Sequence, residues 1–378
     1  MKNITKIIIS GVVLAFFLYL LVSMQVKQEI SSGISSPEFM MELSGVRLRG
    51  WNKEKVAWEM IANQAYYYDK NTLVLLGVND GWFLNEKGDN LIEAMSVSTV
   101  NANIIRKEFV LNELRFNLKT EADESIVLQA DTFRYSDGVF DSENKYLLRV
   151  GEWQISSGKL SFDVNKGVFL FSNKVNINKG KNVINSETGI YYVESNSIKL
   201  KGDVAIDYFI VEKGSEYELF VQSDESDILL TEGEPEVSFV NGLITLGEDV
   251  LQAEYGKYDP DKKNMQMKDA IIRVNDGAKV LNNIDSKELL GSLIKAKVMD
   301  IDFQNKKVQL SGQVVYERNK RKILANRALY DVEKGLLVMH DNVEIVDGNK
   351  IIKSNDVDID VKNDVIVAKG NVKTKLKI

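Results

Sequence analysis

The feature that most restricts the fold of this chain is a sequence repeat. Ala296, Ala325 and Ser354 occupy equivalent positions and follow one another at intervals of 29 residues. Each copy passes from this small residue through a Tyr or Asp turn to a second apolar run, and ends in Gly or Asp followed by Val-x-Ile. We interpret this final Gly-x-Val motif as a hairpin turn between strands. Two strands of eight to ten residues with two turns use about 29 residues. We therefore predict that each repeat is one antiparallel hairpin layer.

Earlier copies extend the repeat towards the N-terminus at longer intervals. The spacing is 37 residues from Ser186 to Ser223 and 43 residues from Ala253 to Ala296, which we interpret as loop insertions. Looser copies begin near Ala65, Ala94, Ala130 and Ser157. The chain has only three prolines, the residue that a central strand does not tolerate. The pattern predicts an all-β fold, an elongated and twisted β-jellyroll or trough of stacked antiparallel strands.

Alternation along the predicted strands separates an inner from an outer face. Lys199, Lys201, Lys268 and Glu344 interleave with apolar residues and are expected to face water. The apolar residues at equivalent positions are predicted to line an inner groove: Leu200, Val204, Met267, Ile271, Leu310, Val314, Leu337, Met339, Val343, Ile345, Ala368 and Val372.

The N-terminus carries an uncharged apolar run from Ile7 to Met24. Eighteen residues in a helix span about 27 Å, close to the thickness of a bilayer core. Lys2 and Lys6 precede the run, which predicts a cytoplasmic N-terminus for residues 1–6 and a single transmembrane helix over 7–24. The alternative is a cleaved signal peptide, and both interpretations place the remainder of the chain outside the cytoplasm. Residues 25–50, with a Ser-rich linker, are predicted to form a stalk.

Catalysis finds little support in the composition. The chain has no cysteine and a single histidine, His340, so thiol nucleophiles and thiolate metal sites are excluded. Asp356, Asp358 and Asp360 align on one strand face, but Val361 stands where a calcium loop of the EF-hand type needs glycine. The net charge of −7 argues against nucleic acid as a partner. We predict that the chain is not an enzyme, with no catalytic residue, metal site or cofactor.

Taken together, these segments resemble the lipopolysaccharide-export bridge proteins of Gram-negative envelopes. The LptC-like part is the N-terminal run, the linker, and the segment from Trp58 to Asp69 with the following Leu73-Val-Leu75-Leu-Gly77. The LptA-like part (the OstA-like fold) is the set of Ala/Ser…Tyr-Asp…Gly-Asn-Val units, clearest over residues 293–378. On this resemblance we divide the exported region into LptC-like repeats over 51–215 and LptA-like repeats over 216–378.

The resemblance implies a function and a set of partners. The chain would be a single-pass inner-membrane protein whose β region lies in the periplasm. Its N-terminal end would meet an ATP-driven ABC permease, and its C-terminal edge another OstA-like bridge protein. The acyl chains of lipopolysaccharide or a related glycolipid would slide along the apolar groove while the headgroup stays in water.

Two other classes of function stay open at this point. A structural or adhesive β-solenoid would have a filled core and no lipid ligand. An enzyme acting on envelope polysaccharide would need the Asp rows to face a cleft, which their predicted outward direction disfavours. Bulky residues that meet across a closed interior favour the solenoid, whereas an open apolar slit favours lipid transport.

Overall fold

The computed structural model describes residues 39–378, apart from residues 53–54, 85–87, 89, 120–124, 143–144, 213–214, 232–233, 247–248, 274–290, 332, 362 and 377–378. Met40–Ile378 forms one compact unit. The transmembrane helix predicted over 7–24 lies outside the described residues. Within the described ranges, the structure has no helix long and apolar enough to cross a membrane.

The described residues form one antiparallel sheet of 26 strands, which confirms the all-β prediction. The strands are β1 (Met41–Asn52), β2 (Lys55–Tyr67), β3 (Thr72–Leu84), β4 (Asn90–Asn103), β5 (Glu108–Lys119), β6 (Ser125–Ser136), β7 (Val139–Ser142), β8 (Tyr146–Val150), β9 (Trp153–Ser156), β10 (Lys159–Asp163), β11 (Val168–Ser172), β12 (Val175–Lys179), β13 (Asn182–Ser186), β14 (Thr188–Tyr192), β15 (Ser197–Glu212), β16 (Ser215–Leu229), β17 (Glu236–Leu246), β18 (Asp249–Asp259), β19 (Asn264–Arg273), β20 (Leu293–Asp302), β21 (Lys307–Arg318), β22 (Arg321–Asp331), β23 (Leu336–Asp347), β24 (Lys350–Asp360), β25 (Val365–Lys369) and β26 (Lys373–Leu376).

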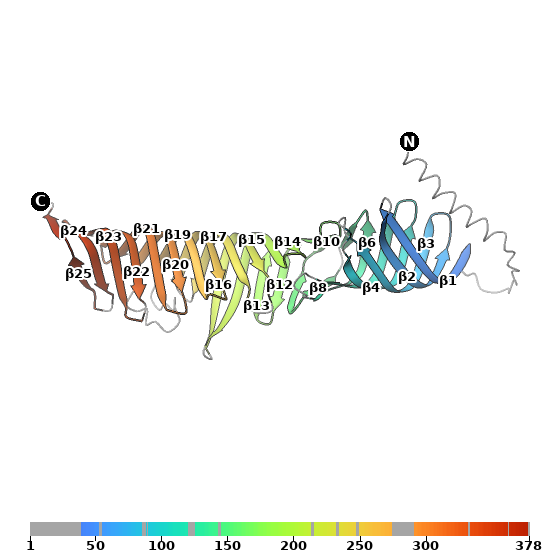
Figure 1. Cartoon of the computed structure of the whole chain (residues 1–378), viewed down its shortest axis with the longest axis horizontal. Helices are drawn as coiled ribbons and strands as arrows, with labels where there is room; N and C mark the ends of the chain where they lie inside the picture. Colours follow the sequence, from blue (N-terminus) through green and yellow to red (C-terminus); the bar gives the residue numbers. More distant parts are fainter. Residues whose placement is uncertain are drawn as a thin grey trace, which may run out of the picture. The chain divides into compact units, whose positions relative to one another are not determined.

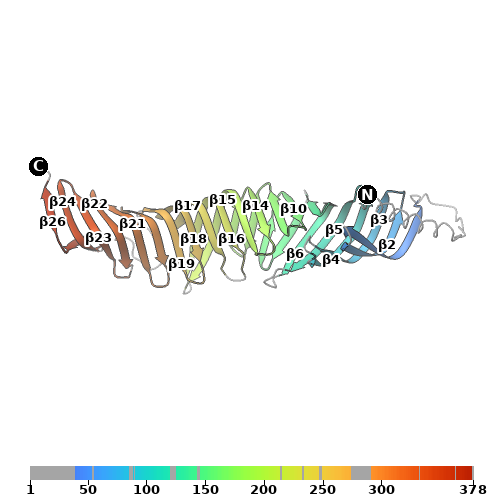
Figure 2. The same ribbon diagram turned by 45° about the horizontal axis from the view of Figure 1, so that its top comes forward.

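Strand pairing within this unit follows the order of the chain. Each long strand from β1 to β6 pairs with the next, and the same holds from β15 to β24. Figures 1 and 2 show this succession of strands within the unit. The clearest repeat copies contain two strands each, as the 29-residue spacing predicts, with β22 and β23 forming one copy.

Between β6 and β15 the sheet separates into two ladders of short strands. Ladder A runs through β7, β10, β11 and β14, and ladder B through β8, β9, β12 and β13. β6 pairs with both ladders: its residues 134–136 pair with β7 of ladder A, and its residues 126–130 pair with β8 of ladder B. β15 does the same, with residues 197–201 on β14 of ladder A and residues 205–207 on β13 of ladder B. In Figure 1, β10 and β14 of ladder A lie above β12 and β13 of ladder B. Because the other long strands pair in turn with β6 or β15, each of them has one half that continues ladder A and one half that continues ladder B. We use the two names for these halves as well.

A corner in the backbone separates the two halves of each long strand. In β21 the pairing register shifts between Ser311 and Val314, and the intervening Gly312 and Gln313 have φ angles of 73° and 56°. The same shift and paired left-handed residues occur at Gly202-Asp203 and at Asp341-Asn342. An extra residue of this kind bends a strand and allows it to pass from one sheet to another.

The corners correct our interpretation of the Gly-x-Val motif as a turn between strands. Gly202 lies inside β15 and Gly312 inside β21, so the motif marks the middle of a strand. Elsewhere the corner separates two strands: Asn173-Lys174 lies between β11 and β12, and Gly370-Asn371 between β25 and β26, which both pair with β24. Left-handed residues are equally typical of hairpin turns and of bulges, so the motif alone did not distinguish them.

Strand pairing continues across two of the predicted boundaries. β1 begins at Met41 and pairs with β2, so the last part of the predicted 25–50 stalk is strand. The boundary predicted between residues 215 and 216 falls at the start of β16, which pairs with β15 along most of its length. Asn52–Ala65, which fits either a helix or a strand by its spacing, lies mostly in β2, and its alternating Met60 and Ala62 are buried.

We predict that Gly312→Ala lowers stability more than Gly348→Ala. Both glycines have positive φ, but a Cβ at Gly312 would come within 2.9 Å of the Lys297 Cβ, whereas Gly348 has open space. A left-handed alanine costs about 1–2 kcal/mol, and at Gly312 the clash adds to this cost. Thermal unfolding of both variants, followed by circular dichroism, measures the difference. Equal losses would show that the corner tolerates a side chain.

Candidate functional site

The interior between ladders A and B is the main candidate site. Its lining is apolar from β2 to β24, and Glu59 is the one charged side chain among the buried residues that the structure describes. Glu59 is held by Arg49, whose Nε lies 2.5 Å from the Glu59 carboxylate. Hydrogen bonding to Arg49 lowers the pKa of this carboxyl, with desolvation acting in the opposite direction. A continuous apolar interior of this kind suits alkyl chains, but it also stabilises the fold as a core.

Most of the residues predicted to line the groove are in this interior. The buried ones, none more than 3 % exposed, are Leu200, Val204, Met267, Leu310, Val314, Leu337, Met339, Val343 and Ile345. Leu310 and Val314 illustrate the arrangement, because they lie on opposite sides of the corner in β21 and both point inward. The two sets of equivalent positions in the repeat therefore correspond to the two ladders.

Ile271 was predicted to point inward, and this prediction is wrong. It is only partly buried, whereas its neighbours Ala270 and Ile272 are 1 % and 5 % exposed. β19 has one left-handed residue at its corner, Asp269, where β21 has two. The inward position after the corner is therefore reached one residue earlier, at Ala270.

Ala368 and Val372 also depart from full burial. Ala368 is partly buried against the core, and Val372 is 50 % exposed. Both belong to the region of β25 and β26, which pair with β24 on one side. Among the described residues no strand pairs with their other side, so the last inward-facing positions lack a covering layer. The interior is uncovered at this edge.

Aromatic side chains fill the interior between β2 and β14. Phe116 from the ladder B half of β5 lies 5.8 Å from Phe140 and 5.7 Å from Phe162, ring centroid to centroid, and both partners belong to ladder A. Phe162 stacks on Phe169 at 4.2 Å. The same cluster includes Trp58, Phe83, Phe109, Phe133, Tyr135, Phe171 and Tyr191. In this section bulky residues meet across a closed interior.

The interior from β18 to β24 contains four methionines and several alanines, together with the buried rings of Tyr316 and Tyr330. Met265, Met267, Met299 and Met339 are all buried. The positions beside the corners hold Ala253, Ala270, Ala296, Ala325, Ala328 and Ser354. Methionine adapts its shape to irregular spaces more readily than an aromatic ring. The interior thus has two chemically different sections, a division that our prediction of a uniform groove did not contain.

The ladder A edge of the interior is formed by a recurring Asp turn. Asp302 at the end of β20 accepts a hydrogen bond from the backbone N–H of Asn305 at 2.8 Å and one from its side-chain amide at 2.7 Å. The same contact with the backbone N–H three residues later recurs at Asp163, Asp259, Asp331 and Asp360. The side-chain and backbone bonds from Asn305 lower the pKa of Asp302, because they favour its charged form.

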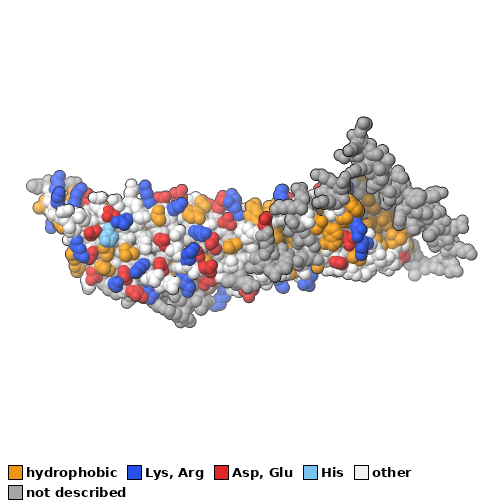
Figure 3. All heavy atoms as spheres, in the orientation of Figure 1, with side chains coloured by type: hydrophobic (Ala, Val, Ile, Leu, Met, Phe, Trp, Pro, Cys, Tyr) orange, Lys and Arg blue, Asp and Glu red, His pale blue; other side chains and the backbone are white. Residues whose placement is uncertain are grey.

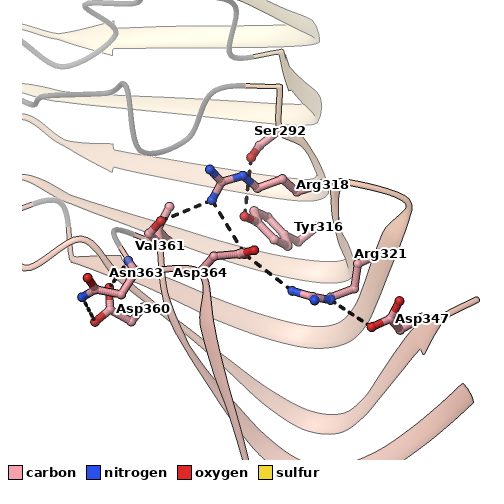
Figure 4. A network of polar contacts seen from close by, with 9 residues as sticks. All are labelled: Ser292, Tyr316, Arg318, Arg321, Asp347, Asp360, Val361, Asn363 and Asp364. Atoms are coloured by element: carbon pink, nitrogen blue, oxygen red, sulfur yellow. Dashed lines mark hydrogen bonds and ion pairs between the residues drawn. The ribbon is translucent and has the colours of Figure 1, made fainter.

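At several points the ladder B edge contacts the ladder A edge, and we call this line of contact the mouth. Trp153 Nε1 donates to the Thr231 carbonyl at 3.3 Å, and Lys179 Nζ approaches the same oxygen at 3.5 Å. Further along, Arg318 Nη1 donates to the Val361 carbonyl at 3.2 Å (Figure 4). Our sequence analysis did not single out these residues. The cationic run Arg318, Lys320, Arg321 and Lys322 is the signal that marks the second contact in the sequence.

The candidate acid–base residues lie on the outer face. His340, the pale blue side chain in Figure 3, has its Nδ1 atom 2.7 Å from Asp356. The two residues are cross-strand neighbours, and both side chains are about 40 % exposed. Asp358 is bonded to Lys369, and Asp360 forms one of the Asp turns. Within the described residues, no cluster of three or more His, Cys, Asp or Glu side chains has the arrangement of a metal site.

Comparisons with known proteins show a likeness to a solved structure. No family model matches the sequence, and no curated protein matches it significantly. The crystal structure of LptH from Pseudomonas aeruginosa, the LptA homologous periplasmic component of the lipopolysaccharide transport device, is similar to part of this chain. The match covers 34 % of this chain and 95 % of that one, with 11 % sequence identity and a TM-score of 0.28.

We predict that the aromatic section is the rigid part of the interior. Phe162→Ala should lower the free energy of unfolding by about 3–5 kcal/mol, since it leaves a cavity among stacked rings. Met339→Leu should cost less than about 1.5 kcal/mol, because volume is conserved at a site lined by adaptable side chains. Guanidinium unfolding followed by circular dichroism measures both. A small effect at Phe162 would show that the rings are loosely packed.

The Asp turns predict a loss of stability in acid. The pKa of Asp302 is lower in the folded chain than in the unfolded one, so its contribution is complete above the ordinary Asp pKa of about 3.9 and is lost as pH falls through the folded value. Asp302→Asn keeps the acceptor oxygen but does not titrate. Its melting temperature should therefore fall less than that of the wild type between pH 7 and pH 3, by thermal denaturation. Parallel curves would contradict the assignment.

Proposed function

We propose that this chain is an inner-membrane-anchored periplasmic bridge component. It carries lipopolysaccharide or a related glycolipid, received from an ATP-driven ABC permease at its N-terminal end, toward the outer membrane. The chain itself does no chemistry in this proposal and is not an enzyme. The acyl chains occupy the interior between ladders A and B, and the headgroup stays in water at the mouth.

The observation that carries the proposal is the apolar interior and its uncovered end. The lining continues through strand after strand without a buried charge beyond Glu59, and at β25 and β26 its last positions are partly exposed. A stack of layers usually ends in a layer with a polar outer face. An apolar end with a free strand edge favours pairing with another chain of the same strand geometry. We propose that an OstA-like bridge protein adds its first strand there.

The apolar run at residues 7–24 supports the anchoring part of the proposal. A tether at the N-terminal end would hold the first layers at the membrane where the lipid is extracted. Lys2 and Lys6 orient such a helix with its N-terminus in the cytoplasm. The β unit would then lie in the periplasm.

A structural solenoid is the second candidate, and the aromatic section favours it. Phe116, Phe140 and Phe162 meet across the interior, so a lipid chain would have to displace side chains there. In the section from β18 to β24, by contrast, the lining includes Met and Ala side chains, which are flexible or small, beside the rings of Tyr316 and Tyr330. The two candidates differ in whether lipid enters the interior at all.

We predict that a photocrosslinker at Ala368 or Met339 forms lipid adducts in membranes. Ala368 faces the interior but is only partly buried, so it tolerates a larger side chain, and Met339 tests a fully buried position. The matched controls are the outward neighbours Val367 and Val338 on the same strands. Adducts at the inward pair, increased by ATP when the permease is present, are the expected result.

The opposite result separates the two candidates. A folded protein that gives no lipid adduct at Ala368 or Met339 has a filled core, and the structural solenoid would then be the better assignment. Equal adducts at Val367 and Ala368 would indicate contact with membrane lipid at the surface and would also contradict transport through the interior.

A further inference from the structure

A loosely paired group of two arginines lies at the mouth near the C-terminal end (Figure 4). Arg318 and Arg321 flank the turn between β21 and β22. Arg318 Nη1 is 4.0 Å and Arg321 Nη1 is 3.5 Å from the same Asp364 oxygen, and Arg321 Nε is 3.4 Å from Asp347. Charge-assisted hydrogen bonds between a guanidinium and a carboxylate usually measure about 2.7–2.9 Å. Both arginines are therefore close to Asp364 without a tight bond to it.

Arg318 also has a hydrogen-bond donor without an acceptor. Its side chain is 17 % exposed, and its Nε is buried without a hydrogen-bond partner. Among the described residues, its side chain has one hydrogen bond, to the Val361 carbonyl. A buried donor without an acceptor is destabilising, and a bound water, an ion or another acceptor can satisfy it.

The surroundings place this group at the boundary between the apolar interior and water. Val361 and Tyr316, beside Arg318, are 0 % and 3 % exposed and belong to the core, whereas the Asp364 side chain is 47 % exposed. A lipid with its chains in the interior would have its headgroup at this depth. A guanidinium presents several N–H donors in one plane, which fits two oxygens of a phosphate better than it fits water.

We propose that Arg318 and Arg321 form a binding site for a phosphate group on the headgroup of the transported lipid. The phosphate takes the place of Asp364 and supplies an acceptor for the buried Nε of Arg318. Asp364 is then an internal competitor that holds the two cations when no lipid is present. This inference rests on the lipid-transport function proposed above and adds to it the chemical group that is recognised and the residues that recognise it.

The alternative is that these residues only hold the two edges of the mouth together. The two roles predict different effects of these substitutions on lipid binding. If the group is only a structural contact, removing Arg318 or removing Asp364 weakens the same contact, and both changes act in the same direction on any lipid. If Asp364 competes with phosphate, removing it strengthens phosphate binding, and removing an arginine weakens it.

The test uses the full chain with a photocrosslinker at Ala368 and phosphatidylcholine vesicles that contain either diphosphorylated lipid A or its dephosphorylated form. For the phosphorylated lipid, Arg318→Gln and Arg321→Gln should each raise the concentration that gives half-maximal adduct by about tenfold, the effect of one lost charged hydrogen bond. Asp364→Asn should lower it. None of the three should change the result with the dephosphorylated lipid.

Two further variants control for folding and for charge. Arg327→Gln removes an arginine that pairs with Asp341 on the outer face, away from the mouth, and should have no effect on either lipid. Arg318→Lys keeps the charge without the planar donor arrangement and should fall between wild type and Arg318→Gln. Loss of adducts in Arg327→Gln as well would show a general charge effect and overturn the site.

The remaining outcomes separate this inference from the proposed function. If wild type forms no adduct with either lipid, the transport function fails. If it binds both lipids equally and the arginine variants do not differ from wild type, transport stands and the phosphate site fails. Inorganic phosphate alone is the last probe. If it raises the melting temperature of wild type but not of Arg318→Gln, while lipid adducts are unchanged, the site binds free phosphate and the lipid assignment is overturned.

Discussion

The corner in the middle of each strand is the constraint on which the rest of this structure depends. A flat sheet of strands this long would expose one apolar face along its whole length. Because the backbone bends at positions such as Gly312-Gln313 and Asp341-Asn342, each strand folds its own apolar face against itself, with one half in ladder A and the other in ladder B. The interior is therefore built within each layer, and it continues from layer to layer as strands are added.

The sequence alone predicted the inward positions where every repeat has the same corner. Leu310 and Val314, Met339 and Val343, and Leu200 and Val204 are separated by four residues, and all of them are buried. The prediction failed at Ile271 because one left-handed residue in place of two changes the phase of alternation by one position. It also overestimated burial at Val372, because alternation says which way a side chain points and not whether another strand covers it. No local pattern contains that information.

Some features depend on contacts between residues far apart in the chain and were not predicted. The ring cluster joins Trp58 near the start of the unit to Tyr191 near its middle through a series of contacts between ladders. Each phenylalanine was visible in the sequence as an apolar residue in a strand, but their convergence follows from the corner geometry. The mouth contacts, such as Arg318 with Val361 43 residues later, have the same origin.

The contrast between the two sections of the interior bears on how such a molecule can combine stability with binding. Stacked rings hold ladders A and B together through many contacts that a guest molecule would have to break, so the aromatic section can supply the rigidity of the unit. The section with Met and Ala has less to lose when its side chains rearrange, and it ends at the uncovered edge. At the mouth of this second section the two contacts from arginine to Asp364 are long, and one arginine donor lacks a partner among the described residues. A chain that only needed a core would gain by tightening this contact. The loose contact lies where the adaptable lining, the open end and the proposed phosphate site come together, which is the arrangement expected if lipid enters this section and not the aromatic one.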